Sequence, residues 1–457
     1  MNQEMDINEN DFIAVDGSTN VDGNYLVWHQ NKLLRIITEN ISFYVSTLQI
    51  INENPCPNLI KTKLISQTDT MLILEHEVID NVTYAIEWTR RQKIIALRAT
   101  LIIQQYLVTY GLTLKDPHAF NITFKCDKPV YLDYGSISNP SYRLYKWFYR
   151  DLMKINNYPE VGWASIIKIS KYKIICISTM LSLLSNRLGM KVLIKIYSVN
   201  ELKTKPSIIM RALIYLGDMI KKIKRLKQLT VYHYAVRIFR KLQSNSKNTH
   251  WTNYNQNTTH TNIKSDRVRN MISIINEHRP ITMLDIGANK GHFSQLALDK
   301  GVKQVVSMDL DEKSLDQLFN HYHIRHKKGY CVKADLMHYP ENINNYARYG
   351  TFQPLYNRIK SDFVICLAVI HHICYFGNYN FDEFINRIKK FATKILVIEF
   401  VPYTDVHLTG KIYNHKDKSW YTQEKFIEAM SRNGYILLMV NSSTPSPRTL
   451  ISFKKIT

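Results

Sequence analysis

The sequence predicts an α/β fold for the carboxyl-terminal half of this chain, and an alternation of strand-like and helical segments supports the prediction. Five runs of mainly aliphatic residues follow residue 264, namely ITMLDIG, KQVVSMDLD, GYCVKADL, SDFVICLAVI and KILVIEFVP. Helical segments at 291–299, 313–322 and 382–391 lie between them. Because strands that alternate with helices form parallel sheets covered on both faces, we expect a mainly parallel sheet that binds its ligand at the carboxyl ends of the strands.

The amino-terminal half shows a mixed α+β pattern instead. Short strand-like runs (YLVW, KLLRII and MLILEHEVI) surround a helical stretch at 42–51, and a strongly helical segment covers 87–110. Residues 141–240 are mostly helical by periodicity, and an Asn- and Thr-rich stretch, QSNSKNTHWTNYNQNTTHTN, follows them. The expected organisation is an amino-terminal domain at 1–240 with a helical extension, a linker at 241–263 and a second domain at 264–457.

The charge balance leaves two kinds of partner open. Among 457 residues there are 60 Lys and Arg against 38 Asp and Glu, a formal net charge of +22, which favours an anionic partner such as nucleic acid. Lys, Ile, Asn and Tyr are all abundant, however, and the positive charge is scattered, with one dense run, KKIKRLKQL. Nucleic acid is therefore an alternative partner, and a small-molecule or saccharide acceptor is preferred.

The cysteines and the apolar segments indicate a cytoplasmic protein. The six cysteines form no CxxC pair and no Cys/His spacing, so neither a zinc site nor a disulfide framework is predicted. The start of the chain, MNQEMDINENDF, lacks the basic and apolar regions of a signal peptide. Charged residues interrupt the most apolar region, at 164–197, so no transmembrane segment is expected.

The predicted carboxyl-terminal sheet carries a candidate nucleoside site. Its first strand ends in a glycine turn, LDIGANKG, where glycine permits a tight turn and close approach of a ligand. Asp309 ends the second strand, about 20 residues beyond that turn, where a carboxylate can accept hydrogen bonds from ribose hydroxyls. Asp335 ends the third strand. The spacing G-A-N-K-G differs from the GxGxxG of dinucleotide enzymes, so three strand ends are expected to converge on a single nucleoside.

In order and spacing, the runs DIGANKGHFS, MDLDEKS, KADLM and SDFVICLAVIHHI resemble the motif series of class I S-adenosylmethionine-dependent methyltransferases. The resemblance implies a Rossmann-like fold, an enzyme and S-adenosylmethionine as its cofactor, with a generic nucleotide-binding sheet as the alternative. The implied contacts are Asp285, Gly287, Asn289 and Gly291 at the methionine part, Asp309 and Leu310 at the ribose, Asp335 and Leu336 at the adenine, and Leu367 to His371 toward the sulfonium.

Two histidines directly after the fourth predicted strand are the candidate catalytic residues. His371 and His372 could accept a proton from an incoming hydroxyl or amine, because histidine titrates near neutral pH. Such histidines are also common as packed or cofactor-adjacent side chains. A histidine pair also suggests metal, but the preceding residues, AVI, supply no carboxylate, and no metal is predicted. Residues 399–402 lie where acceptor-binding residues are expected.

The stretch LKDPHAFNITFKCDKPVYLDYGS in the amino-terminal half follows the pattern of a kinase active site. Asp116 and Asn121 have the spacing of the catalytic-loop Asp and the metal-holding Asn, and Asp133 begins an Asp-Tyr-Gly triplet. The glycine-rich phosphate cover is missing, Arg35 stands in the position of the expected lysine, and the helix at 42–51 offers no glutamate. We interpret the three residues as remnants of a kinase-like lobe, used structurally or for acceptor binding, with an active phosphotransferase as the alternative.

A second resemblance covers most of the chain. The segments LEHEVI, YAIEW, LKDPHAFN, PVYLDYGS, VIEFVP and PRTL resemble those of bacterial methyltransferases similar to the host-specific nodulation protein, which join a kinase-like amino-terminal region to a methyltransferase domain. This resemblance implies transfer of a methyl group to a small-molecule, saccharide or lipid-linked acceptor. The alternatives are an RNA methyltransferase and a bifunctional protein with an active phosphotransferase lobe.

Overall fold

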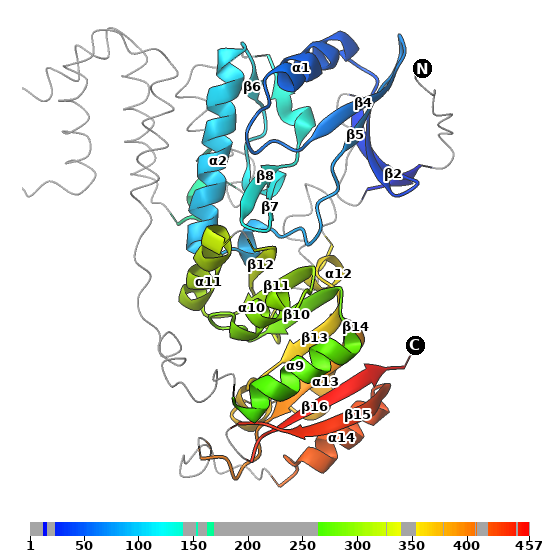
Figure 1. The fold of residues 1–457 in the computed structure, drawn as a ribbon. Helices are drawn as coiled ribbons and strands as arrows, with labels where there is room; N and C mark the ends of the chain where they lie inside the picture. Colours follow the sequence, from blue (N-terminus) through cyan, green and yellow to red (C-terminus); the bar gives the residue numbers. More distant parts are fainter. Residues whose placement is uncertain are drawn as a thin grey trace, which may run out of the picture.

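The structure is a computed structural model, and Figure 1 shows its two folded parts. The residues that it describes are 12–15, 23–139, 152–153, 162–168, 264–325, 327–339, 353–377, 379–406, 408, 419–444 and 447–456. The predicted linker at 241–263 lies outside the described residues, as does most of the predicted helical extension.

The amino-terminal part begins with a five-stranded antiparallel sheet in the order β1-β2-β3-β5-β4. Its strands are β1 (Ile13–Ala14), β2 (Asn24–His29), β3 (Lys32–Ile37), β4 (Thr62–Gln67) and β5 (Leu72–His76). Gln30 and Asn31 join β2 to β3 with φ values of 48° and 63°, as the tight turn of a two-residue hairpin requires. Helix α1 (Ile41–Glu53) connects β3 to β4.

A long helix and short strands complete this part. Helix α2 (Arg90–Thr109) starts at a capping box, in which Thr89 and Gln92 each bond the other's backbone amide. The short elements that follow are β6 (Thr113–Leu114), β7 (Ile122–Lys125), β8 (Lys128–Tyr131), β9 (Ile137–Ser138) and α4 (Trp163–Ile166). Strands β6 and β9 pair with each other, as do β7 and β8, so the loop 115–121 and the turn 132–136 lie close together.

The carboxyl-terminal part is a seven-stranded mixed sheet in the order β12-β11-β10-β13-β14-β16-β15. Its strands are β10 (Thr282–Ile286), β11 (Gln304–Asp309), β12 (Gly329–Lys333), β13 (Ser361–Cys366), β14 (Ala392–Phe400), β15 (Tyr435–Ser442) and β16 (Thr449–Lys455). The first five strands of that order run parallel, and β16 and β15 are antiparallel. The predicted mainly parallel sheet is confirmed, and the antiparallel pair adds two strands to it.

Helices cover both faces of this sheet. They are α9 (Asp266–His278), α10 (His292–Asp299), α11 (Glu312–Arg325), α12 (Leu355–Arg358), α13 (Phe381–Ile388) and α14 (Gln423–Arg432). Alternate residues of β13 belong to two separate cores, because successive side chains of a strand point to opposite faces. Val364 and Cys366 pack in the core that includes α13 and α14, and Phe363 and Ile365 in the core that includes α9 and α10. This order aligns the carboxyl ends of β10, β11, β12 and β13.

Within the described part of the chain, no helix is long and apolar enough to cross a membrane.

Candidate functional site

The turn after β10 is held in a conformation that favours glycine. Gly287, Asn289 and Gly291 have φ values of 78°, 50° and 73°. The amides of Gly287 and Ala288 both donate to the carbonyl of Met308 on β11, at 2.9 and 3.2 Å. A Cβ at position 287 would lie 2.3 Å from Cγ2 of Val369, so the loop after β13 packs directly on this turn. The predicted glycine turn and the predicted loop 367–371 are therefore in contact.

Asp309 connects the first two strand ends. Its Oδ2 accepts the amide of Asn289 at 2.7 Å and its Oδ1 accepts the amide of Asp311 at 2.7 Å. Burial raises the pKa of the Asp309 carboxyl, and the two amides oppose that shift. The next residue, Leu310, is 61% exposed. A half-buried acceptor beside an exposed apolar side chain fits the polar and flat sides of a nucleoside.

Asp285 lies beneath the turn. It is 3% exposed, and its Oδ2 accepts the hydroxyl of Ser294 on α10 at 2.7 Å. Ser294 also accepts the hydroxyl of Ser307, at 2.8 Å, which extends the network into β11. Burial raises the pKa of Asp285 to about 7. The structure thus places this carboxyl between sheet and helix, and its contact with the methionine part stays a prediction.

Asp335 follows the end of β12 and makes hydrogen bonds to residues close to it in the chain. Its Oδ1 accepts the amide of Met337 at 2.9 Å, and its Oδ2 lies 3.0 Å from Nδ1 of His338. The hydroxyl of Tyr379 lies 2.9 Å from the other ring nitrogen of His338. Leu336 is buried in the core, so little of its side chain is open to an adenine ring. The predicted adenine contacts therefore rest mainly on Asp335.

The two candidate histidines differ in exposure. Leu367 is buried in the core, and Ala368 has a φ of 54°, which turns the chain after β13. His371 is buried and His372 is exposed, with their ring centroids 4.0 Å apart in a single turn of π-helix at His371–Tyr375. Because a base must reach the acceptor, His372 is the better placed of the two. No group of three or more His, Cys, Asp or Glu that could hold a metal is present among the described residues.

The segment at 399–402 does not offer its carboxylate to an acceptor. Glu399 is fully buried, pairs with Arg267 at 2.8 Å and accepts the hydroxyl of Ser443. The Glu399 carboxylate is therefore engaged inside the protein, and a role of the segment 399–402 in acceptor binding stays a prediction.

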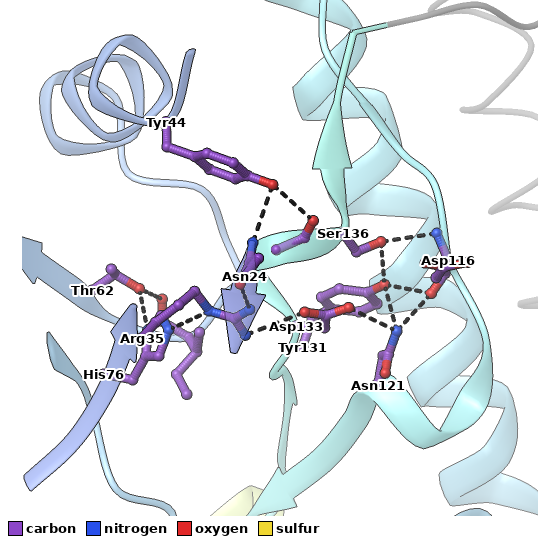
Figure 2. Close-up of polar contacts among 12 residues, drawn as sticks. Asn24, Arg35, Tyr44, Thr62, His76, Asp116, Asn121, Tyr131, Asp133 and Ser136 are labelled. Carbon is purple, nitrogen blue, oxygen red and sulfur yellow. Dashed lines mark hydrogen bonds and ion pairs between the residues drawn. The ribbon is translucent and has the colours of Figure 1, made fainter. Parts of the chain in front are cut away.

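In the amino-terminal part the structure brings Asp116, Asn121 and Asp133 together (Figure 2). Nδ2 of Asn121 donates to Oδ2 of Asp133 at 3.3 Å and to the carbonyl of Asp116 at 2.8 Å. The hydroxyl of Tyr131 donates to the same carbonyl at 2.8 Å, and the hydroxyl of Ser136 accepts the amide of Asp116 at 2.9 Å. Asp116 thus enters this network through its backbone.

Arg35 on β3 completes the network from the antiparallel sheet (Figure 2). Its guanidinium pairs with Asp133 at 3.2 Å and donates to Asn24 at 2.6 Å and to Nε2 of His76 at 3.0 Å. Burial, aided by the arginine charge, holds the pKa of His76 well below its usual value, so the ring is a neutral acceptor. The hydroxyl of Tyr44 on α1 accepts from Asn24 and donates to the carbonyl of Gly135.

Helix α1 is longer than predicted and includes a glutamate, Glu53. That residue lies at the end of the helix and accepts from Gln49 at 3.0 Å on the surface. The partner of Arg35 is therefore Asp133 and not a helix glutamate.

Comparison with known proteins agrees with the carboxyl-terminal geometry. Residues 263–366, which run from before α9 to the end of β13, match the model of the FtsJ-like methyltransferase family. The chain is a class I S-adenosylmethionine-dependent methyltransferase. S-adenosylmethionine is its cofactor.

The methyltransferase is similar to a nodulation protein over most of its length. It is 24% identical over 407 residues to nodulation protein NoeA of Rhizobium meliloti (strain 1021), a match that covers 84% of this chain and 82% of NoeA. Among solved structures, the methyltransferase domain of bacterial CtHen1 is 14% identical with a TM-score of 0.31 and covers 43% of this chain and 100% of that one. The bifunctional kinase-methyltransferase WbdD is 14% identical with a TM-score of 0.30, over 41% of this chain and 38% of that one.

Proposed function

We propose that this methyltransferase transfers a methyl group to a hydroxyl or amino group of a small-molecule, saccharide or lipid-linked acceptor. The likeness to NoeA supports the proposal, because it spans the amino-terminal part as well as the methyltransferase domain. Supplying methyl-labelled S-adenosylmethionine and the full-length protein to a fractionated bacterial extract tests it. We expect the label in a low-molecular-weight or lipid fraction, and label in the RNA fraction alone would contradict this acceptor class.

The strand-end residues hold the cofactor in this proposal. Asp309 accepts the ribose hydroxyls, Leu310 covers the nucleoside, and Asp335 binds at the adenine edge. The glycine turn, with Gly287, Asn289 and Gly291 and with Asp285 beneath it, surrounds the methionine part, while Leu336 and Leu367 pack in the two cores behind the site. When bound, S-adenosylmethionine supplies a methyl carbon activated by the neighbouring sulfonium.

His372 accepts the proton of the attacking group. Methyl transfer needs alignment and a deprotonated nucleophile more than any other catalytic group, so one accessible base at the carboxyl end of β13 suffices. The exposure of His372, in contrast to the burial of His371, supports this assignment. His371 positions the π-helical turn through its packing beside Phe376, with ring centroids 6.0 Å apart.

RNA is the second candidate acceptor, and the net charge of +22 favours it. Binding of RNA to a basic protein weakens steeply as salt rises, because counterions are released from the phosphates. We expect no RNA complex at physiological ionic strength. A tight, salt-sensitive RNA complex would make RNA the preferred acceptor.

The amino-terminal domain, residues 1–240, is a kinase-like scaffold without phosphoryl transfer in our proposal. The pairing of Asp133 with Arg35 supports this role, because a carboxylate already neutralised by a buried arginine is a poor ligand for Mg²⁺. If the domain binds no nucleotide, ATP with Mg²⁺ leaves the melting temperature unchanged. A Mg²⁺-dependent increase with ATP that disappears in Asp133→Ala would instead support the bifunctional alternative.

A further inference from the structure

The amino-terminal domain and the methyltransferase domain share one hydrophobic core. Helix α2 lies next to α11 (Figure 1), and side chains of α11 and β12 pack within the amino-terminal core. Phe124 meets Phe319 edge to face with ring centroids 5.6 Å apart. Nε2 of Gln92 donates to the carbonyl of Cys331 at 3.1 Å, which satisfies a backbone group on the edge strand β12. The two domains are therefore joined along the edge strand β12 of the seven-stranded sheet.

Glu312 links helix α2 to the predicted nucleoside site. The first amides of a helix have no partner inside the helix, and the amide of Arg90, the first residue of α2, donates to the Glu312 carboxylate. The other Glu312 oxygen pairs with Nζ of Lys333 at 2.5 Å. Burial alone would raise the pKa of Glu312, but the hydrogen bonds from Lys333 and the Arg90 amide outweigh it and lower that pKa. The carboxylate is thus charged and held from two sides.

Glu312 and its partner Lys333 each lie within three residues of a predicted cofactor residue. Glu312 begins α11 three residues after Asp309, and Asp309 accepts the amide of Asp311 in the turn between them. Lys333 ends β12 two residues before Asp335, and the amide of Ala334 donates to the carbonyl of Asp309 at 3.1 Å. A movement of Glu312 would therefore move the ribose and adenine ends of the site together.

We propose that Glu312 is a positioning residue through which helix α2 of the amino-terminal domain sets the affinity of the methyltransferase for its cofactor. The inference rests on the proposed cofactor site. It gives the amino-terminal domain a role in cofactor binding that does not require this domain to catalyse a reaction. Its direct contact is the hydrogen bond from the Arg90 amide.

Replacing Arg90 by proline removes that amide at a position where proline fits the fold. Proline suits the first residue of a helix, and Thr89 before it has φ −65° and ψ 162°, the extended conformation that proline favours in its neighbour. Arg90→Ala is the matched control, because it removes the same exposed side chain and keeps the amide. Calorimetric titration of the full-length variants with S-adenosylmethionine compares them directly.

We expect the cofactor to bind Arg90→Pro about fivefold more weakly than Arg90→Ala. This loss is smaller than the full contribution of a hydrogen bond to a charged group, because the bond acts on the cofactor only through Glu312. A second pair of variants tests the same contact from the other side. Glu312→Gln keeps an acceptor for the Arg90 amide and should bind the cofactor more tightly than Glu312→Ala. Equal affinities within both pairs would overturn the proposal.

The variant Gln304→Ala distinguishes a positioning role of Glu312 from a general weakening of the contact between the two domains. Gln304 begins β11, at the opposite end of the strand from Asp309, and bonds Asp80 and Asn81 of the amino-terminal domain. It should leave the cofactor affinity unchanged, and a loss equal to that of Arg90→Pro would overturn the proposal. Failure of the unmodified protein to bind S-adenosylmethionine would instead overturn the proposed cofactor site itself.

Discussion

Two aspartates stand at the centres of polar networks, Asp133 in the amino-terminal part and Asp309 in the carboxyl-terminal part, and their hydrogen-bond partners differ in kind. Asp133 accepts side-chain donors, the buried guanidinium of Arg35 and the amide of Asn121. Asp309 accepts the backbone amides of Asn289 and Asp311 and lies beside an exposed leucine. In the first centre the charge of the Asp133 carboxylate is neutralised by Arg35 inside the protein. In the second centre the Asp309 carboxylate can still accept hydrogen bonds at the end of β11.

This difference shows that the residue spacing of a motif does not by itself make a binding site. The amino-terminal centre has the spacing of a phosphotransferase, yet the side chains of Asn121, Asp133 and Arg35 are engaged with one another (Figure 2). The carboxyl-terminal centre is built largely from backbone groups that fix the carboxylate in place and leave room for neutral donors.

Asp133→Ala should have the largest effect on stability. The substitution leaves Arg35, whose side chain is 6% exposed, as an uncompensated buried charge, so we expect the free energy of unfolding to fall by about 3–5 kcal/mol. Urea denaturation of the full-length protein measures it. The pair of the exposed Lys63 with the partly buried Glu75 in the same antiparallel sheet is the control, and Lys63→Met should cost less than about 1 kcal/mol. Similar losses in both variants would show that Asp133 is not a structural ion-pair partner.

The pH dependence of stability should report on Asp285. Because burial raises its pKa from 3.8 to about 7, the folded protein holds this proton more tightly than the unfolded chain does. The stabilisation is complete below pH 3.8 and is lost as the pH rises through about 7, with a size on the order of 4 kcal/mol.

Asp285→Asn should remove that part of the pH dependence while it keeps an acceptor for Ser294. Unfolding by urea at pH 5 and pH 8 compares the variant with the unmodified protein. If the two lose the same free energy between these pH values, Asp285 is not the titrating group.

His372→Ala should reduce methyl transfer about 100-fold, equal to roughly 2.7 kcal/mol, because the attacking group loses its base. The rate of label incorporation at saturating cofactor measures the effect, and the affinity for S-adenosylmethionine should change little. Asp133→Ala, studied below its unfolding temperature, should keep the transfer rate. A reduction in Asp133→Ala but not in His372→Ala would place the acceptor in the amino-terminal domain.

The sequence predicted that the glycine turn and Asp309 converge, because the signals for both are local. The glycine turn and Asp309 each follow a strand that a continuous aliphatic run identifies, and strand order then brings them together. The antiparallel strands β15 and β16 were missed as strands, since YILLMVNS lacks the alternation that marks a half-buried strand.

The domain interface could not be predicted from residue types. The contact between α2 and the cofactor site is a backbone amide, which every residue except proline carries, so Arg90 gives no sequence signal. Glu312 and Lys333 look like ordinary surface charges in the sequence and become partners only when α11 follows β11 in the sheet. Likewise, nothing in the spacing of Asp133 reveals that an arginine about 100 residues earlier neutralises it.

The most direct test of this account is ligand binding by the full-length protein and two variants, Asp309→Ala and Asp133→Ala, measured by calorimetry with S-adenosylmethionine and with Mg²⁺–ATP. We predict that S-adenosylmethionine binds the unmodified protein and Asp133→Ala equally well. Its affinity for Asp309→Ala should fall by roughly 1.5–3 kcal/mol, the contribution of a charge-assisted hydrogen bond. Mg²⁺–ATP should bind none of the three. Unchanged binding of S-adenosylmethionine to Asp309→Ala, or Mg²⁺–ATP binding that Asp133→Ala abolishes, would contradict the account.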